Sequence, residues 1–534
     1  MIGSSAAAPA TAIVVTSSTP FWFITRATGL VALVLLTASM ALGLLASVRY
    51  QSRGWPRFVT AGLHRNASVL ACAFTGVHIV TTLADGFVPI RLQDVVIPFI
   101  SAYRPVWLGL GAIAFDLMLA LTGHISRYGP ILPPGGGAEL IAEVDRAGLA
   151  GRGGAGFPAA RKMHAVAAAT AGRKSGLLRA DRGSVLVANG VESEPASSKD
   201  KMLLDRSPHL VLDGIALAAA ATGASRAYLC LHDGYPGLAG QLRAAVNERE
   251  RAGADRVPVQ VTEIPGGYVA SQETALISYL NGGPQRPSFV PPRPFERGVH
   301  GRPTLVQNVE TLAHLALIAR YGAAWFRGLG APQSAGSALI TVSGAVRQPS
   351  VLEIELGTRI GDLLERAGGP AEPPQAILAG GYFGGWLPYP AALDIRMTDA
   401  DLRAAGAALG PGILVLLPES ACGLAETART IGYLAGQSAG QCGPCLNGLP
   451  ALADAFDEVA FARPGRDTLG WVRQLLGLVA GRGACQLPDG TAALAASTLR
   501  VFDRDLRRHA ASGPCPQAWR LPVLPEPADQ DAAP

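Results

Sequence analysis

Gly151-Arg152-Gly153-Gly154-Ala155-Gly156-Phe157-Pro158, followed by Lys162, is the stretch around which the 534-residue chain is organised. Its four glycines allow the backbone to adopt positive φ angles and to approach a ligand without a Cβ in the way. Successive N–H groups in such a loop form an anion nest, and Arg152 and Lys162 add positive charge. We therefore predict a phosphate cradle. The loop matches neither the dinucleotide-binding fingerprint nor the Walker loop, and a tight turn in a glycine-rich chain is the alternative.

Further motifs follow the glycine loop in order. They are Asn189-Gly190-Val191-Glu192-Ser193-Glu194-Pro195, Lys199-Asp200, Gly266-Gly267-Tyr268, Gln272-Glu273-Thr274-Ala275-Leu276 and Gly301–Thr311. With these motifs the chain resembles the NADH-binding flavoprotein subunit of bacterial NADH–quinone oxidoreductase, respiratory complex I, from about Ile141 to Leu506. The resemblance implies an FMN whose phosphate lies in the glycine loop, NADH as the electron donor, and a nearby iron–sulfur cluster that receives the electrons.

The same resemblance assigns roles to individual residues. It implies that Glu194 faces the NADH ribose and that Phe157 stacks on the nucleotide side. The cofactor-binding residues implied in this way are Gly151, Arg152, Gly153, Gly154, Phe157, Lys162, Asn189, Glu192, Glu194, Tyr268, Glu273 and Asn308.

The chain departs from the family pattern at several positions. Val191 stands where the family has an acid, Gln272 where it has a Glu, and Gln307 where it has an Asn. An aromatic residue that usually follows the loop lysine is missing from Met163-His164. FMN binding is expected to survive these changes, whereas rapid use of NADH is put in question.

The composition favours a multidomain protein with a membrane part. Hydrophobic residues make up 49% of the chain, charged residues only 16%, and the mean hydropathy is +0.27, which is too apolar for an ordinary soluble enzyme of this length. The net charge of +5 comes without a basic block, so no nucleic-acid partner is expected. Seven cysteines do not make a disulfide framework, and three of them cluster in a metal-binding pattern typical of a reducing compartment.

Three apolar stretches predict a transmembrane domain over residues 20–128, after a disordered N-terminus at 1–19. They lie at about 21–48, 58–83 and 105–126, and each provides the roughly 20 residues that a bilayer helix needs. Arg49, Arg53 and Arg57 lie in the first loop and place it in the cytoplasm by the positive-inside rule. The sequence therefore predicts a multi-pass protein of the cell membrane, in contact with the lipid bilayer, whose large C-terminal part faces the cytoplasm.

Three histidines in these stretches are candidate haem ligands. His64 and His78 are 14 positions apart and share a helix face, while His124 lies level with His64. A haem b between His64 and His124 is geometrically allowed, whereas His78 has no obvious partner. The region also resembles ferric-reductase-like transmembrane domains, which hold stacked b haems, although it is shorter. Hydrogen bonding between helices is the alternative role for these histidines.

The soluble part reads as three domains. Short apolar runs alternate with alanine-rich helical stretches and predict a parallel α/β FMN/NADH-binding domain over 129–335, with the motifs meeting at one end of its sheet. Residues 336–415 resemble the small β-grasp (SLBB) domain of the same family. A helical iron–sulfur domain is predicted over 416–511, and a disordered tail over 512–534.

Cys442, Cys445 and Cys485 are the predicted iron–sulfur ligands. The family motif has a further cysteine where this chain has Ala439, so three of four expected thiolates remain. Ser438, Cys515 or a non-protein ligand completes a [4Fe-4S] cluster, or a [3Fe-4S] cluster forms. Cys72, Cys230 and Cys422 read as small buried apolar residues.

These observations predict a membrane-anchored flavo-iron–sulfur oxidoreductase. Electrons pass from NADH through FMN and the cluster to a membrane acceptor, either haem or quinone. Two alternatives remain open: a protein electron donor in place of NADH, and a catalytically degenerate flavoprotein scaffold that docks a partner or senses redox state.

Overall fold

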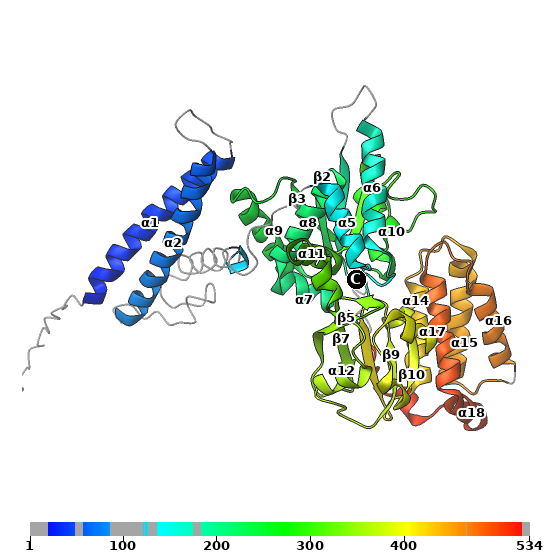
Figure 1. Ribbon diagram of the computed structural model, residues 1–534. Coiled ribbons are helices and arrows are strands. Elements are labelled where there is room, and N and C mark those ends of the chain that lie inside the picture. Colours follow the sequence, from blue (N-terminus) through cyan, green and yellow to red (C-terminus); the bar gives the residue numbers. More distant parts are fainter. Residues whose placement is uncertain are drawn as a thin grey trace, which may run out of the picture. The chain divides into compact units, whose positions relative to one another are not determined.

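The computed structural model describes residues 20–47, 57–85, 121, 123–125, 136–174, 183–465 and 467–525 (Figure 1). The chain divides into two compact units. One contains Met1–Arg127 with Asn247–Ala254, and the other contains Tyr128–Val246 with Asp255–Pro534.

The first unit contains a hairpin of two long helices, α1 (Pro20–Ser47) and α2 (Arg57–Asp85). His78 of α2 donates its Nδ1–H to the backbone oxygen of Thr25 in α1 at 2.7 Å. Its ring also lies against Gly29, where a Cβ would come within 2.8 Å of the imidazole. His78 therefore joins the two helices through a hydrogen bond, which is the structural alternative to haem ligation.

The predicted location in the cell membrane is wrong. Among the described helices, none is both long enough and apolar enough to cross a bilayer. The first two predicted stretches do form helices, α1 and α2. Residues 1–19, most of the third stretch and the side chain of His64 lie outside the described residues, and His124 belongs to a short described helical segment at 123–125.

The α/β domain is built on a four-stranded parallel sheet in the order β3-β2-β1-β4. β1 is almost entirely buried, as expected for a parallel strand covered on both faces. The strands are β1 (Ser184–Gly190), β2 (Ala224–His232), β3 (Val259–Ile264) and β4 (Thr304–Asn308).

Helices cover both faces of this sheet. The larger apolar core lies under α5, α6, α8 and α11, and a smaller one lies under α10. Gly214 permits close contact between α8 and α11, because a Cβ there would come within 2.0 Å of the Leu312 oxygen. The helices are α5 (Gly137–Ala147), α6 (Ala159–Lys174), α7 (Lys199–Arg206), α8 (Pro208–Thr222), α9 (Pro236–Arg251), α10 (Glu273–Leu280) and α11 (Val309–Arg327).

The second domain has a five-stranded mixed sheet in the order β10-β9-β11-β7-β8, after the small hairpin β5 (Gly330–Ala331) and β6 (Ser334–Ala335). β7 and β11 pair in parallel, and the other neighbours are antiparallel. One face packs on α12 (Ile360–Arg366), consistent with the predicted β-grasp domain. The remaining elements are β7 (Ser337–Gly344), β8 (Ser350–Glu355), β9 (Pro374–Ala379), β10 (Gly385–Pro388), α13 (Asp399–Ala404) and β11 (Ile413–Pro418).

The third domain is helical and lies beside the β-grasp sheet (Figure 1). Its core is continuous with the other face of that sheet. The segment Gly513–Pro525, predicted to be disordered, packs on this domain instead, with Cys515, Ala518 and Leu524 buried. Its helices are α14 (Gly423–Gly436), α15 (Leu449–Phe461), α16 (Thr468–Val479), α17 (Leu487–Val501) and α18 (Asp503–Ser512).

Candidate functional site

The glycine loop is a closed turn in which Gly153, Ala155 and Gly156 are exposed. Gly151 donates to the Phe157 oxygen at 2.9 Å, and Gly154 and Gly156 have φ angles of 108° and 62°. Within the described part of the chain, no hydrogen bond of good geometry takes up the N–H groups of residues 153–156. The loop leads directly into the N-terminus of α6, which adds positive potential. This geometry is an anion nest that a phosphate group can occupy.

Polar residues from three other segments meet at the carboxyl edge of the sheet beside the loop. Lys162 contacts Glu273 through Nζ and Oε2 at 2.8 Å. Asn308 lies under the loop, 3.3 Å from where a Cβ of Gly153 would lie, and its Nδ2 donates to the Asn189 oxygen at 3.3 Å. The structure thus brings these predicted residues together at the edge where open α/β sheets bind ligands.

Two predicted residues of the loop point in different directions. Phe157 is 44% exposed, and the Arg161 guanidinium lies 5.5 Å from its ring centroid. Arg152 is buried behind the loop, where its Nη2 donates to the Ser337 oxygen at 2.9 Å. A cavity of about 200 Å³ also lies on this side, between the loop and the β-grasp sheet. Arg152 therefore fixes the loop to the second domain and does not face the carboxyl edge.

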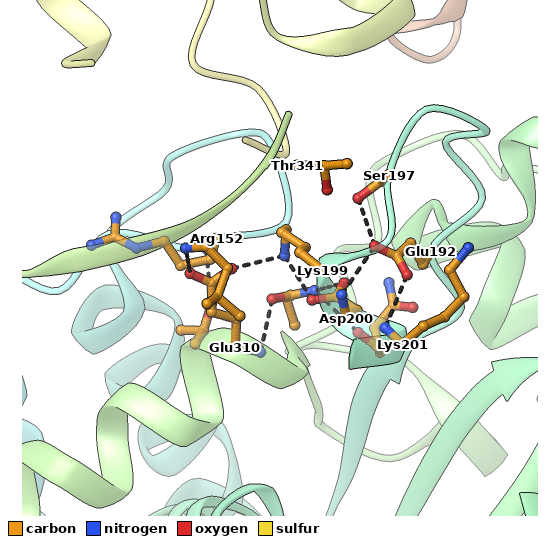
Figure 2. A network of polar contacts seen from close by, with 12 residues as sticks. Arg152, Glu192, Ser197, Lys199, Asp200, Lys201, Glu310 and Thr341 are labelled. Carbon is orange, nitrogen blue, oxygen red and sulfur yellow. Dashed lines mark hydrogen bonds and ion pairs between the residues drawn. The ribbon is translucent and has the colours of Figure 1, made fainter. Parts of the chain in front are cut away.

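A network of buried charged side chains lies next to the site (Figure 2). Lys199 Nζ lies 2.6 Å from Asp200 Oδ1 and 2.8 Å from Glu310 Oε2. Asn308 Nδ2 donates to Asp200 Oδ2 at 2.7 Å, and the Leu339 N–H of β7 donates to Glu310 Oε1 at 2.8 Å. The network therefore connects α7, α11 and β7 of the β-grasp sheet with Asn308 at the carboxyl edge of the parallel sheet.

The protonation of this network follows from burial and neighbouring charge. Burial raises the pKa of Asp200 to about 6, against the opposing effect of Lys199. Burial also disfavours the charged form of Glu310, but Lys199, His314 and Arg152 hold its pKa at about 2. Removing the lysine would leave two carboxylates without their main counter-charge.

Glu192 has a structural role in this conformation. Its Oε1 accepts from the Asp200 N–H at 3.0 Å, and its Oε2 accepts from the Lys201 N–H at 3.0 Å, so it caps the start of α7. Its φ of 37° is unusual for a residue other than glycine. The side chain therefore holds its own loop against the helix.

Glu194 lies where the three domains of the second unit meet. Its Oε2 accepts from the Tyr268 hydroxyl at 2.7 Å and from the Tyr382 N–H at 3.1 Å. Its Oε1 is buried and has no hydrogen-bond partner among the described residues. Burial raises the pKa of the carboxyl to about 7. Glu194 thus points into the domain junction, not toward solvent as its predicted contact with a ribose requires.

Val191, Gln272 and Gln307, which stand where the family pattern has other residues, are each buried or cap a helix. Val191 is fully buried in the smaller apolar core. Gln272 Oε1 accepts from the N–H groups of Thr274 and Ala275 at 2.8 and 2.9 Å and caps α10. Gln307 is buried, and its Nε2 lacks a partner in the described part of the chain, which leaves one donor for a ligand or water.

Of the three predicted cluster cysteines, Cys442 and Cys445 lie between α14 and α15, and Cys485 lies between α16 and α17. Burial disfavours ionisation of Cys442, but backbone N–H groups of Ala484 and Cys445 and the Cys445 thiol hold its pKa below the usual value. Burial raises the pKa of Cys445 to about 12, and Cys442 and Cys485 add to the effect, so the three sulfurs are electrostatic neighbours. Cys515 lies instead with Cys422 and His509.

Comparisons with known proteins follow the same domain order. The family descriptions "Nuo51 FMN-binding domain", "SLBB domain" and "NADH-ubiquinone oxidoreductase-F iron-sulfur binding region" match residues 144–317, 339–382 and 419–509. An F subunit of NADH-quinone oxidoreductase from Rhizobium meliloti (strain 1021) is 30% identical over 390 residues, which cover 71% of this chain and 90% of the relative. The chain belongs to the F-subunit family of NADH–quinone oxidoreductases.

Other members of the F-subunit family and solved structures agree. The NADH-quinone oxidoreductase F subunit of Mycobacterium tuberculosis (strain ATCC 25618 / H37Rv) is 29% identical, covering 71% of this chain and 86% of the relative. The crystal structure of an NAD⁺-reducing [NiFe]-hydrogenase in the air-oxidised state superposes with a TM-score of 0.63 at 33% identity, covering 70% of this chain. This chain spans 62% of the length of that hydrogenase chain.

The predicted family is thus confirmed. The chain is an NADH dehydrogenase-like oxidoreductase of the flavo-iron–sulfur type, with an FMN-binding domain, a β-grasp domain and an iron–sulfur region. The matches do not extend to the predicted ferric-reductase-like segment, and haem is not supported.

The residues present fit an FMN phosphate, because the glycine loop offers consecutive N–H groups without acceptors in the described chain and Lys162 lies nearby. The thiols of Cys442, Cys445 and Cys485 are the ligand type that an iron–sulfur cluster needs, while Ala439 offers no ligand atom. The supporting roles of Lys199, Asp200 and Glu310 were missed from the sequence, although acids in the first turns of α7 and α11 were a usable signal.

Proposed function

We propose that this member of the F-subunit family takes electrons from NADH on FMN held by the glycine loop and passes them to a cluster on Cys442, Cys445 and Cys485. The observation that carries the proposal is the run of backbone N–H groups at residues 153–156 that no described acceptor takes up. A neutral tight turn has no reason to leave these donors exposed at a helix N-terminus beside a lysine.

The chain's own residues hold and orient the flavin in this proposal. The loop N–H groups and Lys162 bind the phosphate, while Asn189, Tyr268 and Asn308 line the edge of the sheet. FMN, when bound, supplies the conversion of a two-electron hydride into single electrons. The Lys199 network keeps Asn308 in place through Asp200.

Phe157 and Glu273 form the proposed NADH side. The exposed Phe157 ring offers a stacking surface, and Glu273 is about one-third exposed at its side chain. Glu194 reaches the nucleotide only if its contacts with Tyr268 and Tyr382 open. We propose that it sets the junction between domains in the resting state.

In this proposal the thiolates of Cys442, Cys445 and Cys485 bind the cluster. Ser438 or a non-protein ligand supplies the fourth corner of a [4Fe-4S] cluster, or a [3Fe-4S] cluster forms. Cys442 and Cys485 are half-buried, and Leu446 of the same loop is 60% exposed, so a protein electron acceptor can approach this side. Quinone is the alternative acceptor.

Anaerobic turnover with ferricyanide as a one-electron acceptor tests the function. FMN-loaded protein should oxidise NADH, and Cys485→Ala should lose its cluster while retaining flavin reduction by NADH. Flavin that NADH does not reduce would exclude the NADH dehydrogenase activity.

A second candidate function is supported by the inward position of Glu194. The electron donor is then a protein such as a ferredoxin, and the carboxyl plays no part in donor binding. Under this candidate, Glu194→Gln leaves turnover with the reduced protein donor unchanged. Under NADH use, the same variant should raise KM for NADH.

A further inference from the structure

A second group of metal-ligating side chains lies in the helical domain, outside the proposed cluster site. Cys422, His509 and Cys515 place one ligand atom each within 4.8 Å of one another, and all three residues are buried. The distance from Cys422 Sγ to His509 Nε2 is 3.9 Å. Zinc–sulfur and zinc–nitrogen bonds of about 2.3 and 2.0 Å in a tetrahedron place such atoms roughly 3.5 Å apart, so little contraction is needed.

His509 is already oriented as a metal ligand. Its Nδ1 lies 3.1 Å from the backbone oxygen of Val459 in α15, and because a carbonyl only accepts, Nδ1 carries the proton. The lone pair of Nε2 therefore faces the two thiols. A histidine that binds metal commonly donates its other N–H to a backbone carbonyl, which fixes the tautomer and the ring.

Cys422 is placed to stabilise a thiolate once a metal is present. It is the residue before α14, so its sulfur lies at a helix N-terminus, where the backbone N–H groups of Ala425 and Leu424 favour the thiolate and act to lower its pKa. Burial nevertheless raises the pKa of this thiol to about 12, with the nearby Cys515 adding to the effect. A buried thiol of this kind stays protonated without a cation, so an ion would displace the proton from each of the two thiols.

We propose that Cys422, His509 and Cys515 bind a single thiophilic metal ion, with Zn²⁺ as the best match to two thiolates and one imidazole. Zn²⁺ accepts three protein ligands with a fourth position left to water or another donor. Binding two Cys thiols and one neutral imidazole releases the two thiol protons to solvent and involves no redox change.

The ion would fasten the C-terminal segment to the helical domain. Cys422 begins α14, His509 lies on α18, and Cys515 lies in the segment that follows α18. Beyond Cys515 the segment is held by Glu426, whose Oε2 accepts from the N–H groups of Val523 and Leu524 at 3.0 and 2.9 Å. Arg429 Nη2 also donates to the Ala518 oxygen at 2.8 Å, so the ion would add a further tie at Cys515.

One contact must change when the ion binds. Nε2 of His509 now accepts the Cys515 backbone N–H at 3.1 Å. The ion would take this lone pair, and the N–H would then be close enough to donate to a thiolate. The same three residues could otherwise remain a hydrogen-bonded cluster, or Cys422 and Cys515 could form a disulfide.

Metal analysis of the full-length purified protein distinguishes these outcomes. After reduction and incubation with Zn²⁺ followed by desalting, wild type should hold about one zinc per chain in addition to cluster iron. Cys422→Ala and Cys515→Ala should lose this zinc and keep their iron. Cys230→Ala, a matched buried cysteine in β2, should keep both metals. Cys485→Ala should lose iron and keep the zinc, which separates this site from the cluster.

A second readout covers variants that fold poorly. Zn²⁺ should raise the Tm of wild type and of Cys230→Ala, and Co²⁺ in its place should give thiolate-to-metal charge-transfer absorption in both. Equal zinc content in wild type and Cys515→Ala would overturn the proposal. So would a wild type without zinc-dependent stabilisation, or a Cys422–Cys515 disulfide found by mass spectrometry in protein purified under reducing conditions.

Discussion

Two regions of the second unit depart from the family pattern with different consequences. They are the carboxyl edge of the parallel sheet, here called the flavin end, and the loops that carry Cys442, Cys445 and Cys485, here called the cluster end. At the flavin end, Gln272 still caps α10 through its side-chain oxygen, and Val191 fills an apolar core. At the cluster end, Ala439 is simply buried and brings no ligand atom to the site. A substitution that only has to complete the fold can be compensated by local packing, whereas a missing metal ligand has to be supplied by another residue or by a non-protein ligand.

The two ends also rest on different kinds of support. The flavin edge stands on a buried charge network that joins two domains through Lys199, Asp200 and Glu310. Backbone N–H groups support the cluster cysteines instead, such as those of Ala484 and Cys445 at the Cys442 sulfur. Mutations should therefore damage the flavin end through charge imbalance and the cluster end through ligand count.

The largest effect should come from Lys199→Met. This change leaves Asp200 and Glu310 buried without their counter-charge and should lower the free energy of unfolding by about 3–5 kcal/mol. Urea denaturation measures the loss, and flavin content should fall with it. Lys201→Met is the control, because the Lys201 ammonium contacts the ring and hydroxyl of the exposed Tyr235. A similar loss in both variants would disprove the role of the network.

The next effect concerns pH and Glu194. Its folded pKa of about 7 is above the unfolded value of 4.5, so its protonated form stabilises the fold. This contribution is fully present below about pH 4.5 and is lost as the pH rises through 7, by at most about 3 kcal/mol. Because Asp200 and Glu310 also titrate differently from the unfolded chain, the measurement is the difference in urea stability between wild type and Glu194→Gln from pH 4.5 to 8. A difference that does not change with pH would contradict the buried carboxyl.

A smaller effect should follow Gly154→Ala. An alanine at φ 108° is strained and should cost about 1–2 kcal/mol in the loop, weakening FMN binding by roughly tenfold. Titration of flavin-free protein with FMN gives the affinity. Gly172→Ala in α6 is the control, since a Cβ there meets no atom within 4 Å and should leave FMN affinity unchanged. Equal affinities in all three proteins would place the phosphate elsewhere.

The smallest change in stability, under about 1 kcal/mol, is expected for Ala439→Cys. It sharpens the comparison, because a fourth thiolate should convert the cluster to a stable [4Fe-4S] form. Iron analysis and EPR of the oxidised protein should show a [3Fe-4S] signal lost in the variant if wild type lacks a fourth ligand. An unchanged iron content and spectrum would mean that wild type already completes the cluster by other means.

Local patterns predicted much of the fold and the edge of the sheet on which the motifs meet. Alternating apolar runs predicted β1 and β2, and the glycine loop predicted a turn with free N–H groups. The direction in which a side chain points could not be predicted from the sequence. Arg152 and Glu194 point into the domain junction, because their hydrogen-bond partners Ser337 and Tyr382 lie far along the chain. Apolar length alone predicted three membrane spans, whereas none of the described helices is long and apolar enough to cross a bilayer.

The most direct test is the absorbance spectrum of the purified protein, oxidised, after anaerobic NADH and after dithionite. We expect a flavin spectrum that NADH bleaches, together with broad iron–sulfur absorption that decreases as electrons reach the cluster, and no Soret band. A colourless protein, or one whose flavin responds to dithionite and not to NADH, would contradict electron transfer from NADH through FMN to the cluster.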